Sequence, residues 1–300
     1  MAKGVSAMSL NFGTLNFGTL KFGTSGLRGL VSEITRKECQ AYAFAFLEML
    51  KNKNLSFSKI AMAGDLRAST PEILGFLAEA FLTQGLEIDF IGFIPTPALA
   101  LYTTHYQIPG VMVTGSHIPE DRNGIKFYLP SGEILKREEE LITKYRQSYS
   151  QSSESREPLS GKAKFDITRV NQQGKQLYIK RYKDFFGNFS LEGLRVGVYE
   201  HSAVGRDILI SVLTDLGAQV VRFDRSEHFI PVDTEAVENI AKLSSWVQQN
   251  SLTALVSTDG DSDRPLLVDD EGEVWSGDKI GLVVAKALQA QVVVTPISST

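Results

Sequence analysis

Hydrophobic residues in the first half of the chain alternate between short apolar runs, typical of buried strands, and longer stretches with helical spacing. Thr35 and Glu38 have the spacing of a capping box that would begin the first helix. This alternation predicts an α/β layered domain. The expected strands cover 59–63, 87–92 and 110–114, and the expected helices cover 35–50, 70–84 and 98–106.

The same alternation returns after a polar stretch at 148–155, which predicts a linker followed by a second α/β unit. A helix at 278–288 and a strand at 292–295 would start a third unit. The predicted fold class is therefore α/β, with mixed sheets and flanking helices in two consecutive layered domains plus the start of a third. The expected strands of the second unit cover 195–199, 219–223 and 253–257, and its helices cover 205–216 and 234–249.

Domain boundaries follow from this organisation. Residues 11–15 and 16–20 both read Asn-Phe-Gly-Thr-Leu, a repeat that we interpret as a leader or an artefact outside the fold. The predicted division is 1–20 for that leader, 21–150 for domain 1, 151–160 for the linker, 161–276 for domain 2 and 277–300 for the start of a truncated domain 3.

Composition and charge narrow the class of protein. With 300 residues and 43% hydrophobic content the chain can bury sizeable cores, and a net charge of −4 gives no support for a nucleic-acid or membrane partner. No apolar stretch reaches the roughly 20 residues of a transmembrane helix, and the amino terminus lacks the pattern of a signal peptide. Cys39 lies in a helical pattern and is predicted to be a core thiol. As the single cysteine it excludes an intrachain disulfide, which fits a cytoplasmic location.

Three aspartates at alternate positions, Asp259, Asp261 and Asp263, lie between two apolar runs that predict strands. In a tight loop all three carboxylates can turn toward one hard cation, and Mg²⁺ is the ion expected there. A calcium EF-hand loop would need Gly and Glu where Arg264 and Asp270 stand, so that interpretation fails. A solvated acidic turn is the remaining alternative.

Two further segments combine small residues with polar side chains. Ser116 follows an expected buried strand, where its hydroxyl can face a cleft, but the Gly-x-Ser-x-Gly motif of serine hydrolases is absent. The adjacent His117 is, by itself, typical of a loop residue that forms hydrogen bonds. Segment 21–29 is rich in glycine, so its backbone can approach an anion, and Arg28 can add a charged fork. A plain glycine-rich turn is the alternative there, and the absence of a Walker A motif leaves no argument for a nucleotide.

Together these segments resemble the α-D-phosphohexomutases, the phosphomannomutase and phosphoglucomutase superfamily, and they occur in the family's order. Segments 64–69 and 95–97 resemble further signatures of its first domain, and the resemblance covers about residues 21–300. The family usually has Ala where Gly115 stands and often Asn where Ile118 stands. The matching segments read Phe-Gly-Thr-Ser-Gly-Leu-Arg-Gly at 22–29, Thr-Gly-Ser-His-Ile-Pro at 114–119 with Asn-Gly-Ile-Lys at 123–126, and Asp-Gly-Asp-Ser-Asp-Arg at 259–264.

The resemblance implies a phosphoserine enzyme, an isomerase of the phosphomannomutase or phosphoglucomutase type. Ser116 would carry a phosphoryl group that moves between C1 and C6 of mannose or glucose phosphate through a hexose 1,6-bisphosphate, which also serves as activator. Mg²⁺ would be held by Asp259, Asp261, Asp263 and the phosphate on Ser116. The expected partner is a hexose phosphate, with no nucleic acid and no membrane, and the oligomeric state is left open.

The resemblance also implies roles for the neighbouring side chains. Lys126 is expected to accept the proton of the sugar hydroxyl, because an amine crowded by cations such as Arg28 can fall toward neutrality. His117 is the second candidate for this base. Arg264 is expected to contact the ligand, with an ion pair to an aspartate of its own loop as the alternative. Ser25 is expected at the substrate and resembles the hexose mutases, whereas the glucosamine branch usually has Asp there.

In the family, a third and a fourth domain bind the sugar and the non-reacting phosphate, and neither segment is found in this sequence. We therefore expect weak mutase turnover from this chain alone, because orientation supplies much of the rate in such chemistry. Three alternatives stay open. They are a non-catalytic phosphosugar- or metal-binding regulatory fragment, a phosphoglucosamine mutase, and a metal phosphatase.

Overall fold

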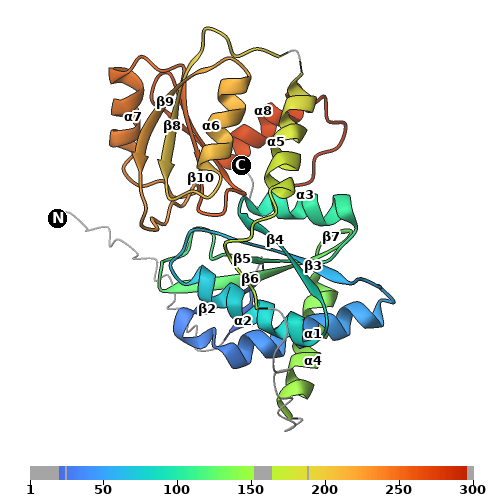
Figure 1. Ribbon diagram of the computed structural model, residues 1–300. Coiled ribbons are helices and arrows are strands. Elements are labelled where there is room, and N and C mark those ends of the chain that lie inside the picture. The colour runs from blue at the N-terminus through green and yellow to red at the C-terminus, as the bar shows by residue number, and fades with distance from the viewer. Residues whose placement is uncertain (1–19, 24–25, 152–163, 188, 296–300) are drawn as a thin grey trace, which may run out of the picture.

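The computed structural model describes residues 20–23, 26–151, 164–187 and 189–295. Within them the chain forms two mixed β-sheets, each flanked by helices, as Figure 1 shows. The predicted α/β class with mixed sheets is confirmed. The predicted leader apart from Leu20, the predicted linker apart from Gln151, and Ser25 lie outside the described residues.

The first sheet contains seven strands, which are β1 (Lys21–Phe22), β2 (Leu27–Leu30), β3 (Lys59–Gly64), β4 (Glu87–Phe93), β5 (Gly110–Val113), β6 (Arg122–Leu129) and β7 (Gly132–Glu133). Their order is β1-β2-β6-β5-β3-β4, with β7 paired to β6. β3 runs parallel to β4 and β5, and the other pairs are antiparallel. Side chains alternate between the two faces, so Ile60 and Met62 join one hydrophobic cluster while Ala61 and Ala63 join another.

Five α-helices pack on this sheet, which are α1 (Arg36–Asn52), α2 (Thr70–Thr83), α3 (Thr96–Tyr106), α4 (Lys136–Gln151) and α5 (Gln173–Phe186). α1, α2 and α4 cover the face away from the second sheet, and α3 and α5 cover the other face (Figure 1). The Thr35 hydroxyl accepts a hydrogen bond from the Glu38 N–H at 3.3 Å, as expected for the start of α1. Cys39 is fully buried in α1, which confirms the predicted core thiol, and burial raises its pKa to about 12.

The second sheet contains β8 (Arg195–His201), β9 (Gln219–Arg225), β10 (Ala254–Thr258), β11 (Pro265–Asp269) and β12 (Val274–Trp275). Their order is β12-β11-β10-β8-β9, and β8 is parallel to both β9 and β10. The helices of this half are α6 (Arg206–Asp215), α7 (Ile240–Gln249) and α8 (Gly277–Ala287). Leu243 and Val247 of α7 pack against Leu255 and Val268 of the sheet.

A shared layer of helices joins the two halves. α5 packs against α3 of the first half on one side and against α6 of the second half on the other. Tyr102, Tyr178 and Ile208, one from each of these helices, belong to a single buried cluster. The loops that follow β5 and β10 meet each other, through Ser116 and Asp259.

The structure differs from the sequence-based expectations at three places. The helix expected at 234–249 begins only at Ile240, because Asn239 has a left-handed backbone (φ 57°) and residues 234–239 form an irregular segment. The polar stretch expected to be a linker from 148 onward is helical up to Gln151, as the end of α4. Residues 292–295 carry no strand, since among the described residues no neighbouring strand pairs with them.

None of the helices in the described part of the chain is both long enough and apolar enough to cross a membrane.

Candidate active site at the seam between the sheets

Ser116 lies in a loop that leads from β5 into β6, which we call the serine loop (residues 114–122). Its side chain is 1% exposed, and its backbone adopts the left-handed conformation with φ 54°. That conformation costs a residue with a Cβ roughly 1–2 kcal/mol, so the surrounding contacts must hold it. One of them is the hydrogen bond that the Ser116 N–H donates to Thr114 Oγ1 at 2.8 Å.

Arg67 supplies four further hydrogen bonds to the serine loop. Its guanidinium is 1% exposed and forms an ion pair with Asp65, whose Oδ2 lies 3.3 Å from Nε. Gly115 leaves room for this group, because a Cβ there would lie 2.5 Å from Arg67 Cζ. The guanidinium donates hydrogen bonds to the carbonyl oxygens of Ser116 (3.0 Å), Ile118 (2.5 Å), Pro119 (2.7 Å) and Arg122 (3.0 Å).

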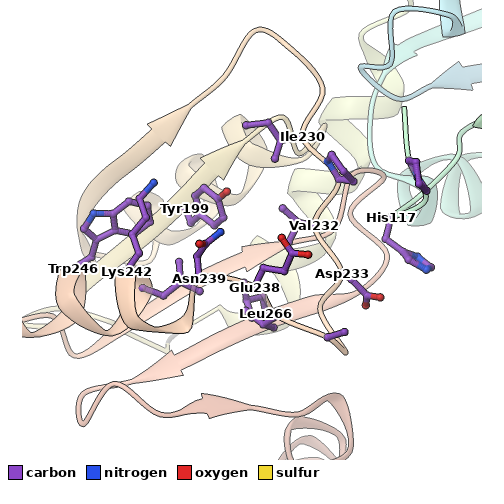
Figure 2. Close-up of a pocket in the computed structure, with 15 residues that line it drawn as sticks. His117, Tyr199, Ile230, Val232, Asp233, Glu238, Asn239, Lys242, Trp246 and Leu266 are labelled. Atoms are coloured by element: carbon purple, nitrogen blue, oxygen red, sulfur yellow. The ribbon is translucent and has the colours of Figure 1, made fainter. Parts of the chain in front are cut away.

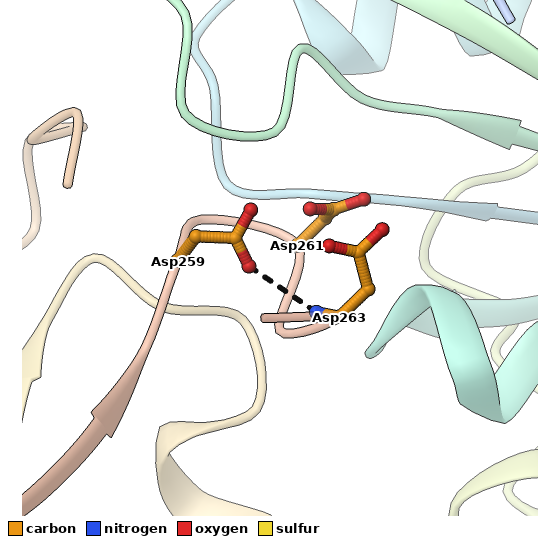
Figure 3. A group of neighbouring side chains, drawn as sticks. All are labelled: Asp259, Asp261 and Asp263. Atoms are coloured by element: carbon orange, nitrogen blue, oxygen red, sulfur yellow. Dashed lines mark hydrogen bonds between the residues drawn. The ribbon is translucent and has the colours of Figure 1, made fainter. Parts of the chain in front are cut away.

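The aspartate loop (residues 259–264) connects β10 to β11 and directs three carboxylates to one side, as Figure 3 shows. Asp259 Oδ1 accepts hydrogen bonds from the backbone N–H groups of Asp263 and Arg264, both at 3.2 Å. Thr96, at the start of α3, donates its hydroxyl proton to Asp261 Oδ2 at 2.6 Å. The loop is therefore held from within and from the first half of the chain.

The serine loop and the aspartate loop meet between the two sheets, at a place that we call the seam. Ser116 and Asp259, which meet there, are 143 positions apart in the sequence. The Ser116 hydroxyl donates a hydrogen bond of 2.5 Å to Asp259 Oδ2. The backbones are also close, because a Cβ on Gly260 would lie 2.7 Å from the Ser116 carbonyl oxygen. The structure thus brings together the serine and the aspartates that the sequence singled out separately.

The donor set of the aspartate loop fits a hard divalent cation. One carboxylate oxygen from each of Asp259, Asp261 and Asp263 lies within 4.8 Å of the others. Asp261 Oδ1 is buried and accepts no hydrogen bond from any described residue, so it is available as a ligand. Burial, together with the neighbouring Asp261 and Asp263, raises the pKa of Asp259 well above its ordinary range. This crowding of negative charge is what a bound cation would relieve.

Lys126 lies on β6 and reaches the aspartate loop from the opposite sheet. Its Nζ is 2.9 Å from Asp261 Oδ2 and 2.8 Å from Asp263 Oδ2. Burial lowers the pKa of Lys126, but the two carboxylates raise it by more than burial lowers it, so the net shift is upward. The expectation that neighbouring cations would push this amine toward neutrality is wrong for the arrangement seen here, because its nearest neighbours are anions.

His117 is the second candidate base and lies next to Ser116. Its Nδ1 is 3.4 Å from Ser116 Oγ, and burial, with a contribution from Arg264 and Arg28, lowers its pKa. His117 lines a cavity of about 310 Å³ together with residues of the 230–239 segment. In Figure 2 the imidazole lies at one end of this group of side chains. Tyr199 and Trp246 line the opposite part of that cavity.

Of the two arginines expected at the site, Arg264 ends the aspartate loop and Arg28 comes from the first sheet. Arg28 is on β2, where burial lowers its pKa while Asp261 opposes that shift. Arg264 is one-third exposed, with Nη1 3.6 Å from Glu235 Oε1 and Nε 3.9 Å from Asp263 Oδ1. The alternative of a pair within its own loop is therefore present as a long contact.

Comparisons with known proteins bear on both halves. Residues 19–153 match the family model described as phosphoglucomutase/phosphomannomutase, alpha/beta/alpha domain I, and residues 176–272 match the corresponding domain II. The crystal structure of a phosphoglucomutase/phosphomannomutase family protein from Burkholderia thailandensis superimposes with a TM-score of 0.69 at 20% identity. That match covers 89% of this chain and 58% of the other. It supports the fold of the described residues.

Curated relatives show higher identity. A phosphomannomutase from Sinorhizobium fredii is 41% identical over 280 residues, which is 92% of this chain and 58% of the relative. A phosphomannomutase from Salmonella muenchen is 38% identical over 296 residues, with coverage of 98% and 57%. A phosphoglucosamine mutase from Caldicellulosiruptor bescii is 30% identical over 277 residues, with coverage of 89% and 60%. The chain thus spans somewhat more than half the length of these relatives.

Proposed function

Because this chain belongs to the phosphoglucomutase/phosphomannomutase family, we propose that it performs the phosphoryl-transfer chemistry of a hexose-phosphate mutase. The observation that carries the proposal is the 2.5 Å hydrogen bond from the Ser116 hydroxyl to Asp259 Oδ2. It places a candidate phosphoryl acceptor beside a carboxylate cluster suited to a divalent cation. Lys126 and His117 add two nitrogen bases within the same small volume.

The proposed reaction begins with a phosphoryl group on Ser116. A free hydroxyl of the hexose phosphate attacks the phosphorus, its O–P bond forms as the Ser116 Oγ–P bond breaks, and its proton passes to a base of the protein. Ser116 Oγ, the leaving group, takes up a proton, so the products are a hexose 1,6-bisphosphate and a free serine hydroxyl. After the bisphosphate turns around, Ser116 takes the other phosphoryl group, so the phosphate has moved between C1 and C6.

Asp259, Asp261 and Asp263, with an oxygen of the phosphate on Ser116, are the groups that would hold Mg²⁺. A phosphoserine carries about −1.5 to −2 charges at neutral pH, and the carboxylates add more. When bound, a divalent cation neutralises this charge and aligns the phosphoryl oxygens. Arg28 interacts electrostatically with the three aspartates, and both Arg28 and Arg264 lower the pKa of His117. We propose that these two arginines compensate the negative charge that the cation leaves.

We propose Lys126 as the base, with His117 as the second candidate. Lys126 can accept a proton only after it gives up its ion pairs with Asp261 and Asp263, since both carboxylates raise its pKa. His117 already has a lowered pKa and is 3.4 Å from the serine oxygen. The two residues therefore differ in whether the site must rearrange before the proton moves.

Mannose or glucose phosphate is the proposed substrate. The phosphomannomutase relatives are 38–41% identical to this chain, whereas the phosphoglucosamine mutase from Caldicellulosiruptor bescii is 30% identical. Ser25, at the position proposed to contact the sugar, lies outside the described residues. We further propose a cytoplasmic location for this chemistry.

The test is the half-reaction on Ser116. The full chain is incubated with Mg²⁺ and mannose or glucose 1,6-bisphosphate, and peptide mass spectrometry follows phosphate on Ser116. We expect phosphorylation that disappears when mannose 1-phosphate or glucose 1-phosphate is added, while glucosamine 1-phosphate removes it at least about tenfold more slowly. The Ser116→Ala variant, which lacks the acceptor oxygen, serves as the control.

A serine that stays unmodified, or a phosphate that hexose phosphate fails to remove, would contradict the mutase proposal and favour a non-catalytic phosphosugar- or metal-binding protein. Release of the phosphate as inorganic phosphate without any sugar would favour the metal phosphatase.

A further inference from the structure

Phe229 lies between β9 and α7 and contacts both the aspartate loop and the arginine that holds the serine loop. Its side chain is 6% exposed, and its ring centroid is 3.9 Å from Arg67 Cζ, a distance typical of a cation–π contact. Its edge faces the aspartate loop, because a Cβ on Gly260 would lie 2.9 Å from Phe229 Cε2. One aromatic side chain of the second half therefore contacts the arginine that holds the serine loop and the glycine between the first two aspartates.

Arg67 needs such a neighbour. Its charge is removed from water, and the carboxylate paired with it, Asp65, is shared with Thr70 and Thr114, whose hydroxyls donate to it at 2.6 and 2.8 Å. The face of an aromatic ring stabilises a desolvated guanidinium more than an aliphatic side chain does. The ring also closes the planar face of the group, so that its N–H donors stay directed at the carbonyl oxygens of the serine loop.

We propose that Arg67 and Phe229 are positioning residues that set Ser116 against the aspartate loop. This inference rests on the proposed function, since it concerns the residue that would carry the phosphoryl group. Arg67 fixes the serine backbone through the Ser116 carbonyl oxygen, and Phe229 fixes Arg67 relative to Gly260. The left-handed conformation of Ser116 is maintained by this chain of contacts, and without the ring the serine loop gains freedom while the aspartate loop keeps its own internal hydrogen bonds.

The experiment compares Phe229→Leu, which keeps apolar bulk, with Phe229→Tyr, which keeps the ring. Hydrogen exchange of the full chain is measured at the amides of Ser116 and Ile118, which are hydrogen-bonded within the serine loop. We expect exchange about tenfold faster in Phe229→Leu and close to wild type in Phe229→Tyr. Phe223→Leu is the matched control, because Phe223 stacks on Trp246 in the same half, away from the serine loop.

A second measurement is the rate of Ser116 phosphorylation by a hexose 1,6-bisphosphate. In Phe229→Leu the rate at saturating bisphosphate should fall about tenfold. The bisphosphate concentration that gives half the maximal rate should change little, and so should the dissociation constant of Mn²⁺, which serves as a probe of the proposed Mg²⁺ site. Arg67→Lys should show the same pattern, since a lysine cannot reach four carbonyl oxygens at once.

The outcomes separate the two proposals. Unchanged exchange at Ser116 and Ile118 in Phe229→Leu overturns the positioning role, as does faster exchange spread evenly over both sheets, which indicates a merely structural residue. If Phe229→Leu does not fold, Arg67→Lys decides by the same exchange measurement. If wild type is never phosphorylated, the proposed function fails, whereas the exchange comparison still tests the positioning role.

Discussion

Thr96 illustrates how a single hydroxyl can tune the aspartate loop from outside it. The residue lies at the start of α3, and its hydroxyl donates to Asp261 Oδ2 while its N–H donates to the Asp261 carbonyl oxygen at 2.9 Å. A hydroxyl that donates a hydrogen bond to a carboxylate orients it and favours its ionised form, which lowers its pKa. Burial raises the pKa of Asp261, but Lys126 and Thr96 together lower it, so this carboxylate stays ionised.

The Thr96→Val variant tests this role. It preserves shape and removes the hydroxyl, so we expect Mn²⁺ affinity to fall about tenfold, the low end of the range for outer-shell partners. Isothermal titration of the full chain with Mn²⁺ gives the dissociation constant. Thr103→Val is the matched control, because Thr103 is a buried threonine of the same helix whose hydroxyl bonds to the Ala100 carbonyl oxygen. Equal affinities in the two variants would contradict the prediction.

At the residue scale the sequence singles out the candidate reactive groups better than the residues that hold them in place. Ser116 and the three aspartates occur in short local patterns, and in the structure Ser116 Oγ lies 2.5 Å from Asp259 Oδ2. Arg67 and Thr96 were noticed only as parts of segments that resemble the family, without a role. Their contacts reach residues 49 and 165 positions away, and local spacing contains no information about such pairs. Phe229 gives no signal in the sequence, since a single phenylalanine in an irregular segment does not differ from any other core residue.

The last residue of β8, His201, is a buried titratable side chain that has no role in the proposed site. His201 is fully buried, and its Nε2 lies 2.8 Å from the Thr258 carbonyl oxygen at the end of β10. Burial lowers the pKa of His201 to about 4, although the bond to Thr258 opposes this shift. The histidine is therefore neutral in the folded protein at pH values where it is already charged in the unfolded chain.

This difference predicts a loss of stability in mild acid. The pKa of His201 in the folded protein lies below the ordinary value of 6.5. The contribution of the neutral histidine to the free energy of unfolding is therefore fully present above pH 6.5 and is lost as the pH falls toward 4. Between pH 7 and pH 5 the loss should be about 2 kcal/mol, and His201→Gln should remove most of it. Urea unfolding at both pH values measures this, with the exposed His228→Gln as control. An acid sensitivity that His201→Gln leaves intact would assign it to other groups.

At the element scale the predictions succeeded where apolar runs were short and bounded. All six expected strands of the two sheets form, as the buried patterns of β3 and β5 illustrate. The sequence analysis does not predict β6 or α5. The apolar run of β6 is interrupted by Lys126, which contacts the aspartate loop, and α5 is rich in charged residues. The start of α7 was placed too early, since the apolar spacing of 234–239 serves to cover a cavity and not to form a helix.

At the scale of the whole molecule, the layer of α3, α5 and α6 decides how the two sheets are held. Tyr178 of α5 is 6% exposed, packs in the cluster shared by these helices, and accepts a hydrogen bond from the Tyr182 hydroxyl at 2.9 Å. The sequence could not predict this layer, because a helix rich in charged residues gives no sign that its apolar stripe is divided between two partners.

Tyr178→Ala should lower the free energy of unfolding by about 3 kcal/mol, the cost of replacing a buried aromatic side chain. Urea unfolding followed by circular dichroism measures the change. Phe185→Ala on the same helix is the control, since Phe185 is 60% exposed and should change stability by less than about 0.5 kcal/mol. Equal effects of the two substitutions would show that α5 is not a structural joint.

The joint formed by α5 also limits how the seam at Ser116 can open. If either sheet swung outward, the cluster around Tyr178 would be exposed to water, so a wide hinge motion is opposed by the hydrophobic effect. Sliding of packed helices past one another preserves that burial and amounts to roughly 1–2 Å. Such a shear is enough to separate a hydroxyl from a carboxylate 2.5 Å away. Access to Ser116 would then depend on how far α5 can slide against its neighbouring helices, and not on the mobility of a loop.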